Sequence, residues 1–598
     1  MATGTEGNDN LTNDGTQSVE TINALGGDDI ITVNRPQGIF TDRIIEVNGG
    51  DGFDTLIINA NNYTIGGATG FDGSMRVREG SSVNWTTYWT SIERFELNNG
   101  RFFSTDIVLG DEIDIIRMSP GFGGRISTNG GNDEIYFTGT GQDKPVVADG
   151  GAGDDIVDLS GLLYFGSAPG VHEAIGGEGN DTLRGSAYRD RVDGGAGDDN
   201  ISLYYVHPSI ADDSVVFDTA LGGAGSDNFF FGAALSQYDV VTGGADTDTL
   251  VIQGNYAGGL TLSANVTEIE NLSILAGSNT AFGDPGTNLY DYVITTRDVN
   301  FAAGVQARIN GAALLAGEDF TFDGSAETDA KFVVYGGKGK DTLTGGLGND
   351  IFFYAEERFA SGDTVNGGPG YDGMFLRGNY TIDFNAPGYT GLFTNIENLT
   401  LTSATDERYA RGGGTEFDYN LTLSNAIVKP GETLTVSGAL LMASETMILD
   451  ASQESDGFLR LFGGKADDTL KGGGQADLLL GNLGADMLTG NGGADTFRFD
   501  STADSTSGSL DRITDFTPGT DKIDLGRIDA NTLVAGDQAF TWIGSNAFSG
   551  TAGELRIENL NGSGWLLLGD TDGNGFGDLR IILDLQGPTP LSGADFIL

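Results

Sequence analysis

The chain has no cysteine and only two histidines among its 598 residues. Without cysteine it can form neither a disulfide nor a thiolate metal site. The histidines, His172 and His207, do not belong to an H-E-x-x-H motif, and the sequence contains no G-x-S-x-G. These absences argue against a zinc protease and against a serine hydrolase of the lipase type.

Basic residues are also scarce. Lysine and arginine together number 31 against 86 acidic residues, which gives a formal net charge of −55. Such a charge excludes nucleic acid as a natural partner and disfavours an anionic membrane. Mutual repulsion should expand a chain of this kind, and bound cations should relieve it and couple metal binding to folding.

Long apolar segments are missing as well. No run approaches the roughly 18 residues that a transmembrane helix needs. The first residues, MATGTEGNDNLTND, have neither the basic nor the apolar region of a secretory signal peptide. If the protein is exported, we expect a route that does not read the N-terminus.

Proline is rare, with 12 residues against 97 glycines, and the glycines follow no collagen-like triplet. They recur instead with a period of nine. The segment Gly463–Arg498 divides into the four nonapeptides GGKADDTLK, GGGQADLLL, GNLGADMLT and GNGGADTFR. Each begins with glycine, has aspartate in the sixth place and has an apolar residue in the eighth.

This spacing has a physical interpretation. Glycine permits positive φ and therefore a tight turn whose carbonyl groups point inward. The aspartate adds a hard oxygen ligand of the type that Ca²⁺ prefers. The last three residues form a short strand with one side chain directed inward. One nonapeptide is then half a coil, and loops about 18 residues apart should stack along one edge with metal between them.

Further copies of the nonapeptide occur from Gly4 onward. Asp190 has the sixth place in the degenerate copy GSAYRDRVD, but Arg189 and Arg191 should weaken a cation site there. We predict that the remaining aspartates in the sixth place are metal ligands: Asp9, Asp29, Asp54, Asp133, Asp155, Asp181, Asp199, Asp227, Asp248, Asp341, Asp350, Asp372, Asp468, Asp477, Asp486 and Asp495.

The pattern G-G-x-G-x-D-x-U-x resembles the calcium-binding repeat of RTX proteins. The segments DRITDF, DKIDL and the terminal DFIL resemble the C-terminal domain of the serralysin family, over roughly residues 463–598. The resemblance implies several bound Ca²⁺ ions and export through the type I secretion machinery. It does not extend to protease activity, because the zinc motif is missing. The acidic, cysteine-free and repeat-rich chain also resembles RTX-type bacterial surface-layer proteins.

A longer repeat lies above the nonapeptide. GGKGKDTL from Gly336 recurs as GGKADDTL from Gly463, 127 residues later, and IENL at Ile269 recurs at Ile396. A fainter copy includes SIERFEL. We therefore predict an N-terminal degenerate module, a cluster of nonapeptides, two duplicated modules with β-rich inserts and a C-terminal secretion domain, with the boundaries 1–137, 138–242, 243–366, 367–498 and 499–598.

Three features leave alternatives open. Paired acidic residues such as Asp154 and Asp155 are expected to be calcium ligands or solvated charges, although a carboxylate-based active site stays an alternative. The segment WTTYW, Trp85–Trp89, is either core or an exposed platform for a sugar or a second subunit. DTDGNGFGD, Asp570–Asp578, resembles the start of an EF-hand loop, but Ile581 replaces the final glutamate, which favours a polar turn.

Together these observations predict an all-β protein, an elongated right-handed parallel β-roll with irregular β-rich inserts. We expect a secreted, non-enzymatic, calcium-binding structural protein, located outside the cell or on its surface, that binds to itself in a surface layer or matrix. Cell-surface polysaccharide is a further expected partner. The alternatives are a calcium-dependent adhesin or carbohydrate-binding protein and a polysaccharide-active enzyme on a β-helix.

Overall fold

The computed structural model divides the chain into two compact units. Unit 1 comprises Met1–Tyr290 with Ile294–Arg308, and unit 2 comprises Asp291–Val293 with Ile309–Leu598. This division falls inside the predicted module 243–366. The structure describes residues 1–13, 19–34, 43–59, 64–65, 74–79, 82–90, 92–100, 107–118, 124–137, 145–162, 170–203, 217–233, 235–282, 284–389, 392–406, 416–560, 562 and 564–598.

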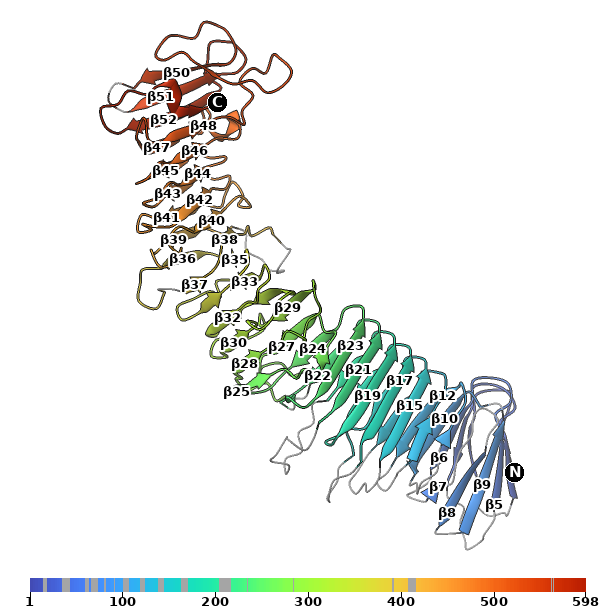
Figure 1. The fold of residues 1–598 in the computed structure, drawn as a ribbon. Helices are drawn as coiled ribbons and strands as arrows, with labels where there is room; N and C mark the ends of the chain where they lie inside the picture. Colours follow the sequence, from blue (N-terminus) through green and yellow to red (C-terminus); the bar gives the residue numbers. More distant parts are fainter. Residues whose placement is uncertain are drawn as a thin grey trace. The chain divides into compact units, whose positions relative to one another are not determined.

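Unit 1 is a parallel β-roll, as the sequence predicts. Each coil contributes one strand to each of two opposed walls, and strands of successive coils pair in parallel (Figure 1). The first wall contains β2 (Asn10–Thr12), β4 (Ile30–Val33), β6 (Thr55–Asn59), β10 (Arg94–Gly100), β12 (Ile113–Met118), β14 (Glu134–Phe137), β16 (Ile156–Asp158), β18 (Thr182–Arg184), β20 (Asn200–Ser202), β22 (Asn228–Phe231), β24 (Thr249–Ile252) and β27 (Asn271–Ile274).

The opposite wall of unit 1 consists of two sheets. One contains β1 (Ala2–Thr3), β3 (Val19–Asn23), β5 (Arg43–Asn48) and β9 (Ser82–Thr90), with β8 (Ser74–Glu79) and β7 (Thr64–Ile65) added in antiparallel pairs. The other contains β11 (Ile107–Val108), β13 (Gly124–Ser127), β15 (Val146–Ala152), β17 (His172–Glu178), β19 (Asp190–Ala196), β21 (Thr219–Ala224), β23 (Val240–Ala245) and β26 (Val266–Thr267). Three strands near the boundary are β25 (Tyr256–Thr261), β28 (Tyr292–Thr295) and β29 (Gln306–Asn310).

Unit 2 repeats this plan. Its first wall contains β31 (Lys331–Tyr335), β33 (Ile351–Ala355), β35 (Gly373–Arg377), β38 (Asn398–Leu401), β40 (Thr433–Ser437), β42 (Phe458–Phe462), β44 (Leu478–Leu480), β46 (Thr496–Arg498), β48 (Lys522–Asp524) and β53 (Phe596–Ile597). Its second wall contains β30 (Phe320–Asp323), β32 (Asp341–Thr344), β34 (Thr364–Asn366) and β37 (Phe393–Thr394), followed by β36 (Tyr380–Asp383), β39 (Tyr419–Thr422), β41 (Met447–Asp450), β43 (Thr469–Lys471), β45 (Met487–Thr489), β47 (Asp511–Phe516) and β52 (Leu579–Leu585).

The second wall of unit 2 ends in an antiparallel hairpin. β51 (Trp565–Asp570) pairs antiparallel with both β52 and β50 (Glu554–Asn559), and β49 (Thr541–Trp542) pairs in parallel with β50. The described residues contain no α-helix, only the short 3-10 turns η2 (Thr502–Asp504) and η3 (Gly593–Asp595). None of the described helices is long and apolar enough to cross a membrane.

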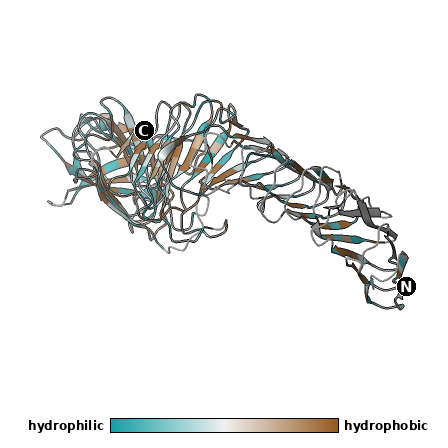
Figure 2. Cartoon of the chain, turned by 90° about the horizontal axis from the view of Figure 1, so that it is seen from below, coloured by the Kyte–Doolittle hydropathy of each residue, from teal (hydrophilic) through white to brown (hydrophobic). Residues whose placement is uncertain are grey.

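The core of unit 1 is a narrow apolar layer between the two walls. Inward and outward side chains alternate along each strand, and Figure 2 shows the matching alternation of hydropathy along many strands. The apolar eighth residues of the repeats stack in register in the first wall, and smaller residues face them from the second. The stacked residues are Ile135, Val157, Leu183, Ile201, Phe229 and Leu250 in the first wall and Ala148, Ala174, Val192, Ala220 and Val241 in the second.

Candidate metal centres

The predicted ligands of unit 1 lie on one edge of the roll, at the entry to the strands of the first wall. There each aspartate receives the backbone N–H of its counterpart in the preceding coil. Asp155 N–H donates to Asp181 Oδ1 at 2.7 Å, and Asp181 N–H donates to Asp199 Oδ1 at 2.8 Å. We call this row the unit 1 carboxylate ladder; its central run is Asp133, Asp155, Asp181, Asp199, Asp227 and Asp248, and Asp9, Asp29 and Asp54 form a separate N-terminal run.

The second carboxylate oxygen has no such partner along most of this ladder. In Asp181, Asp199 and Asp248 the side chain is completely buried, and Oδ2 has no hydrogen-bond partner among the described residues. Burial raises the pKa of each of these carboxyl groups to about 7, and neighbouring acidic groups add to the shift. Above this pKa the row is ionised, buried and without donors, and a cation bound beside it would supply the compensating charge. The same free oxygen occurs in Asp29, Asp54, Asp133, Asp155 and Asp227.

The glycine that begins each repeat leaves room for this oxygen. A Cβ on Gly176 would lie 2.1 Å from Asp181 Oδ2 and 2.5 Å from the carbonyl oxygen of Gly194 in the next coil. Only glycine therefore allows a carboxylate and a carbonyl oxygen to approach the same point. Gly177 and Gly179, the second and fourth residues, have φ of 124° and 125°, in the left-handed region. The resulting set of hard oxygens fits Ca²⁺.

Unit 2 carries ladders on two edges. Asp468 N–H donates to Asp486 Oδ1 at 2.7 Å, and Asp477 N–H donates to Asp495 Oδ1 at 2.8 Å. Each pair is 18 residues apart, and the two pairs lie on opposite edges, as the half-coil interpretation predicts. Asp486 has a free, buried Oδ2, and burial raises its pKa to about 8.

Comparisons with known families agree with this geometry. Residues 175–203 and 333–356 match the family described as RTX calcium-binding nonapeptide repeat. Residues 413–598 match Peptidase M10 serralysin C terminal. The chain is an RTX repeat protein. No curated protein matches the chain.

The two family matches give the protein its cofactor and its export route. The protein binds several Ca²⁺ ions, and its serralysin-type C-terminal domain marks it as a protein secreted by the type I route. That C-terminal domain is not catalytic. When bound, the ions would neutralise the negative charge of the free Oδ2 atoms. The aspartates and the glycine carbonyl groups would hold them.

Four RTX loops of unit 2 have a different conformation. In the loops that begin at 336, 345, 463 and 472, the second glycine has no positive φ, and its N–H donates to the aspartate. Gly346 N–H lies 2.7 Å from Asp350 Oδ2, and Gly473 N–H lies 2.6 Å from Asp477 Oδ2. Both carboxylate oxygens of these aspartates therefore accept backbone hydrogen bonds. The equivalent contacts join Gly337 with Asp341 and Gly464 with Asp468.

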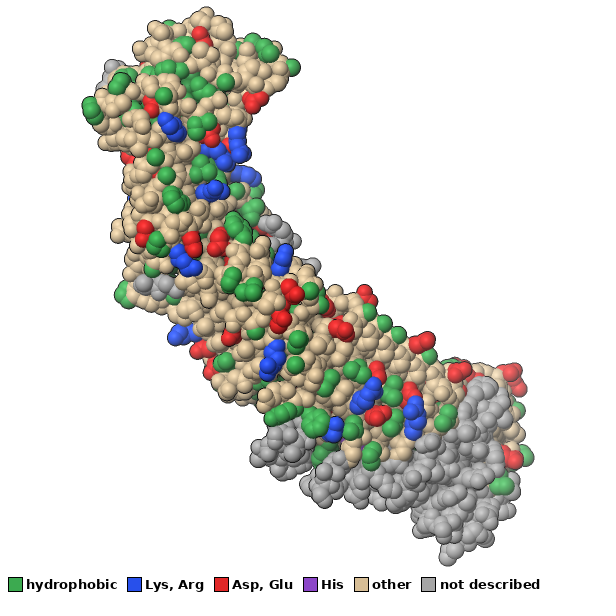
Figure 3. Space-filling model, in the orientation of Figure 1, with side chains coloured by type: hydrophobic (Ala, Val, Ile, Leu, Met, Phe, Trp, Pro, Cys, Tyr) green, Lys and Arg blue, Asp and Glu red, His purple; other side chains and the backbone are tan. Residues whose placement is uncertain are grey.

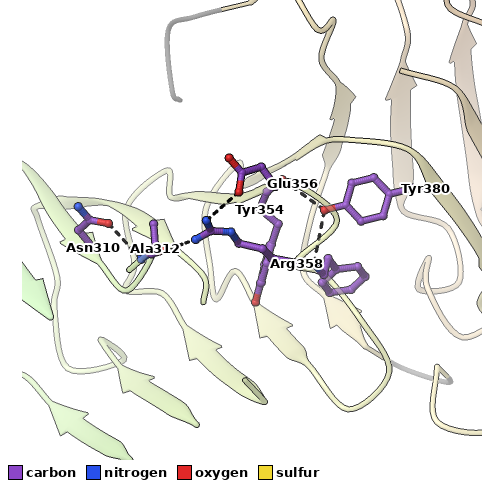
Figure 4. A network of polar contacts seen from close by, with 7 residues as sticks. Asn310, Ala312, Tyr354, Glu356, Arg358 and Tyr380 are labelled. Atoms are coloured by element: carbon purple, nitrogen blue, oxygen red, sulfur yellow. Dashed lines mark hydrogen bonds and ion pairs between the residues drawn. The ribbon is translucent and has the colours of Figure 1, made fainter. Parts of the chain in front are cut away.

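Asp341 also lies beside an aromatic cluster of unit 2. A Cβ on Gly336 would lie 2.1 Å from Tyr354 Cε1, so this glycine makes room for the tyrosine as well. Tyr380 Oη donates to the Tyr354 carbonyl at 3.4 Å, and Arg358 pairs with Glu356 at 3.1 Å in the turn after β33 (Figure 4). Burial raises the pKa of Asp341 to about 8.

The structure adds ladder residues that the nonapeptide pattern does not contain. Asp114 is completely buried, both of its carboxylate oxygens are free, and its N–H donates to Asp133 at 2.8 Å. Asp511 and Asp521 extend the two C-terminal ladders by accepting the N–H groups of Asp486 and Asp495. These residues lie in DEID, DRITDF and GTDKIDL, where no glycine pair precedes the aspartate. These aspartates are recognised as ladder residues by their contacts with the neighbouring coil, because the local sequence lacks the nonapeptide motif.

Asp190 lies on the opposite edge of unit 1. There Asp190 N–H donates to Asp218 Oδ1, and Asp218 N–H donates to Asp239 Oδ1, both at 2.8 Å. The Oδ2 atoms of Asp190 and Asp239 are occupied, because Ser186 N–H and Ser236 N–H donate to them at 2.7 Å. We call this row the hydrogen-bonded edge. Within the part of unit 1 that the structure describes, Asp190, Asp218 and Asp239 have no free buried oxygen comparable with those of the carboxylate ladder.

The other sequence candidates have simpler roles. Asp570 is buried at the end of β51, and its two oxygens accept Gly573 N–H and Gly575 N–H of the following turn at 2.7 and 2.9 Å, which agrees with a polar turn. His172 is buried in β17, and burial lowers its pKa to about 4. His207 and the side chains of the segment WTTYW lie outside the described residues.

Proposed function

We propose that this RTX protein is a secreted structural protein that folds on calcium outside the cell and assembles with itself into a surface layer or matrix. One observation carries the proposal. Ladders of buried carboxylates occur in both units, so the coils that they join make up the body of the protein and do not merely support a separate domain.

The charge distribution supports a switch between an exportable and a folded chain. In a cytosol low in calcium, repulsion within the ladders should keep the coils open. Outside the cell, sites of the extracellular type fill at roughly 10⁻⁴–10⁻³ M calcium. Binding to the folded form alone then stabilises it by mass action.

The outer walls support assembly of the folded form. Most of the described surface seen in Figure 3 is backbone or uncharged polar side chain, with hydrophobic and charged groups scattered over it. Apart from the half-buried Asp9, the ladder aspartates are buried, so calcium would neutralise charge that is inside the edges of the coils. Walls of parallel strands repeat from coil to coil, and such a surface can meet a second copy over several coils.

Electron microscopy of the full chain tests this proposal. With millimolar calcium we expect an ordered sheet, tube or filament, and with magnesium at equal ionic strength we expect none, because magnesium requires a smaller octahedral site. Dispersed, folded monomers at high concentration in calcium would contradict self-assembly. Glycan binding by such monomers would favour an adhesin instead, and turnover of an acidic polysaccharide would favour an enzyme.

A further inference from the structure

Three glutamates occupy ladder positions that the nonapeptide pattern assigns to aspartate. Asp54 N–H donates to Glu93 Oε2 at 2.8 Å, and Asp248 N–H donates to Glu270 Oε2 at 2.8 Å. In unit 2, Asp372 N–H donates to Glu397 Oε2 at 2.7 Å. Each glutamate follows an isoleucine in the recurring segments SIERFEL, EIENLSI and NIENLTL, and each lies where a run of aspartates ends.

The backbone of the three segments has one geometry. The N–H groups of Glu270 and Asn271 both point to the Asp248 carbonyl oxygen, at 3.2 and 2.9 Å. Glu397 and Asn398 make the same pair of contacts with Asp372, at 3.0 and 3.1 Å, and Glu93 and Arg94 make it with Asp54, at 3.2 and 3.1 Å. The isoleucines Ile92, Ile269 and Ile396 are buried and anchor the turn in the core.

The residue before each isoleucine supplies a carbonyl oxygen in both segments where it is described. Glu268 and Asn395 have φ of 57° and 53°, in the left-handed region. A Cβ on Gly243 would lie 1.7 Å from the Glu268 carbonyl oxygen and 2.4 Å from Asp248 Oδ2. A Cβ on Gly367 would meet Asn395 O and Asp372 Oδ2 in the same way, at 2.0 and 2.5 Å.

An ordinary coil presents the same two atoms with a longer loop. At Gly222, for example, the Gly243 carbonyl oxygen and Asp227 Oδ2 lie 2.5 and 2.1 Å from the added Cβ. The six-residue loop G-G-x-G-x-D is thus replaced by the three-residue turn x-Ile-Glu, and the extra methylene of glutamate compensates for the shorter backbone. Because Asp54, Asp248 and Asp372 are completely buried with a free Oδ2, each junction contains an oxygen that lacks a partner.

We propose that Glu93, Glu270 and Glu397 are calcium ligands that complete a cation site with Asp54, Asp248 and Asp372 at the end of each run. Two carboxylates, joined at the Glu270 and Glu397 junctions by a backbone carbonyl, are a hard oxygen set suited to Ca²⁺. The x-Ile-Glu turn then ends a ladder by binding its last ion, and the chain continues from this turn into the insert. This inference does not depend on self-assembly.

The test counts the calcium bound by the full chain, by equilibrium dialysis with elemental analysis. The variant combines Glu93→Gln, Glu270→Gln and Glu397→Gln, since glutamine keeps an oxygen for the aspartate N–H and loses the charge. The control combines Glu173→Gln, Glu416→Gln and Glu432→Gln, which remove the same charge from β17 and from exposed positions of unit 2. Circular dichroism in calcium verifies the fold of both.

We expect the ladder variant to lose one ion for each glutamate replaced and the control to lose none. Glu270→Gln alone should lose one ion, which preserves the test if the triple variant does not fold. An unchanged ion count in the folded ladder variants would overturn the proposal, and so would an equal loss in the control, because the effect would then be one of net charge.

Discussion

The two edges of unit 1 have the same backbone register and different chemistry. On both, an aspartate receives the N–H of its counterpart in the preceding coil at about the same distance. On the carboxylate ladder the second oxygen is free, as in Asp199, whereas on the hydrogen-bonded edge a serine N–H occupies it, as in Asp239. In unit 1, an aspartate at a stacked turn therefore keeps a free oxygen only where the loop withholds its own donors.

The conformation of the loop glycines accounts for this difference between the two edges. At Gly195 and Gly197 the positive φ values of 112° and 126° turn the loop so that no N–H of the repeat reaches Asp199 Oδ2. At Ser186 and Ser236 the loop directs an N–H to the carboxylate and closes on itself. We therefore expect the carboxylate ladder to depend on an ion and the hydrogen-bonded edge to do without one.

Removal of calcium should have the largest effect. At pH 7.5 a chelator leaves the buried ladder charges uncompensated, and an unpaired buried charge costs about 3–5 kcal/mol. We expect loss of the β signal in circular dichroism. In partial chelation, hydrogen exchange should accelerate at the N–H groups of Asp155 and Asp181 before it does at Asp190 and Asp218. A β signal that persists in chelator would contradict this dependence.

Replacement of ladder aspartates by asparagine should have the second-largest effect. Asp181→Asn with Asp199→Asn keeps the Oδ1 acceptors but removes two charged ligands, so folding should require at least roughly tenfold more calcium. The matched pair Asp190→Asn with Asp239→Asn, on the hydrogen-bonded edge, should leave the number of bound ions unchanged. Isothermal titration calorimetry measures both. Equal loss of calcium binding in the two pairs would show that the edges do not differ.

A single methyl group should have a smaller effect. In Gly194→Ala the new Cβ would lie 2.2 Å from Asp199 Oδ2, and such overpacking should destabilise the calcium-bound protein by about 1–3 kcal/mol. The control is Gly258→Ala in β25, where a Cβ meets nothing within 4 Å. Urea unfolding in calcium compares them. Equal stability of the two variants would remove the steric reason for the first glycine.

The response to pH should be the most gradual. Burial raises the pKa of Asp181 and Asp199 to about 7 in the folded protein, above the value of about 3.9 for an unfolded chain. Without calcium, these groups favour folding at low pH, and their contribution is lost as the pH rises from about 4 through 7. In chelator the urea midpoint should therefore fall with rising pH, and a midpoint that rises would contradict the burial of these carboxylates.

The sequence alone predicts the parts that depend on local chemistry. The parallel roll, the burial of Leu183 and Phe497 in the eighth place, and the shared edge of Asp468 and Asp486 all follow from a period of nine. The backbone conformation of each loop does not follow from the period of nine. Gly177 and Gly346 have the same place in the motif, yet only Gly177 has positive φ. Gly177 lies against Gly151 of a neighbouring coil and Gly346 lies against Glu327, and the motif contains neither neighbour.

The glutamates at the ends of the runs illustrate the same limit. Nothing in the short turn before Glu270 resembles G-G-x-G-x-D, and the residue reaches the ladder only because its coil stacks on that of Asp248. The recurrence of IENL marks the segment as important in the sequence without giving its role. Contacts between coils more than 20 residues apart decide the role of these positions, and a motif nine residues long does not contain them.

Anomalous scattering from crystals of the full chain grown in calcium tests the central claim most directly. The account predicts peaks beside the free Oδ2 atoms of the unit 1 carboxylate ladder and none along the hydrogen-bonded edge at Asp190, Asp218 and Asp239. Peaks of equal strength on both edges, or a ladder without peaks, would contradict it.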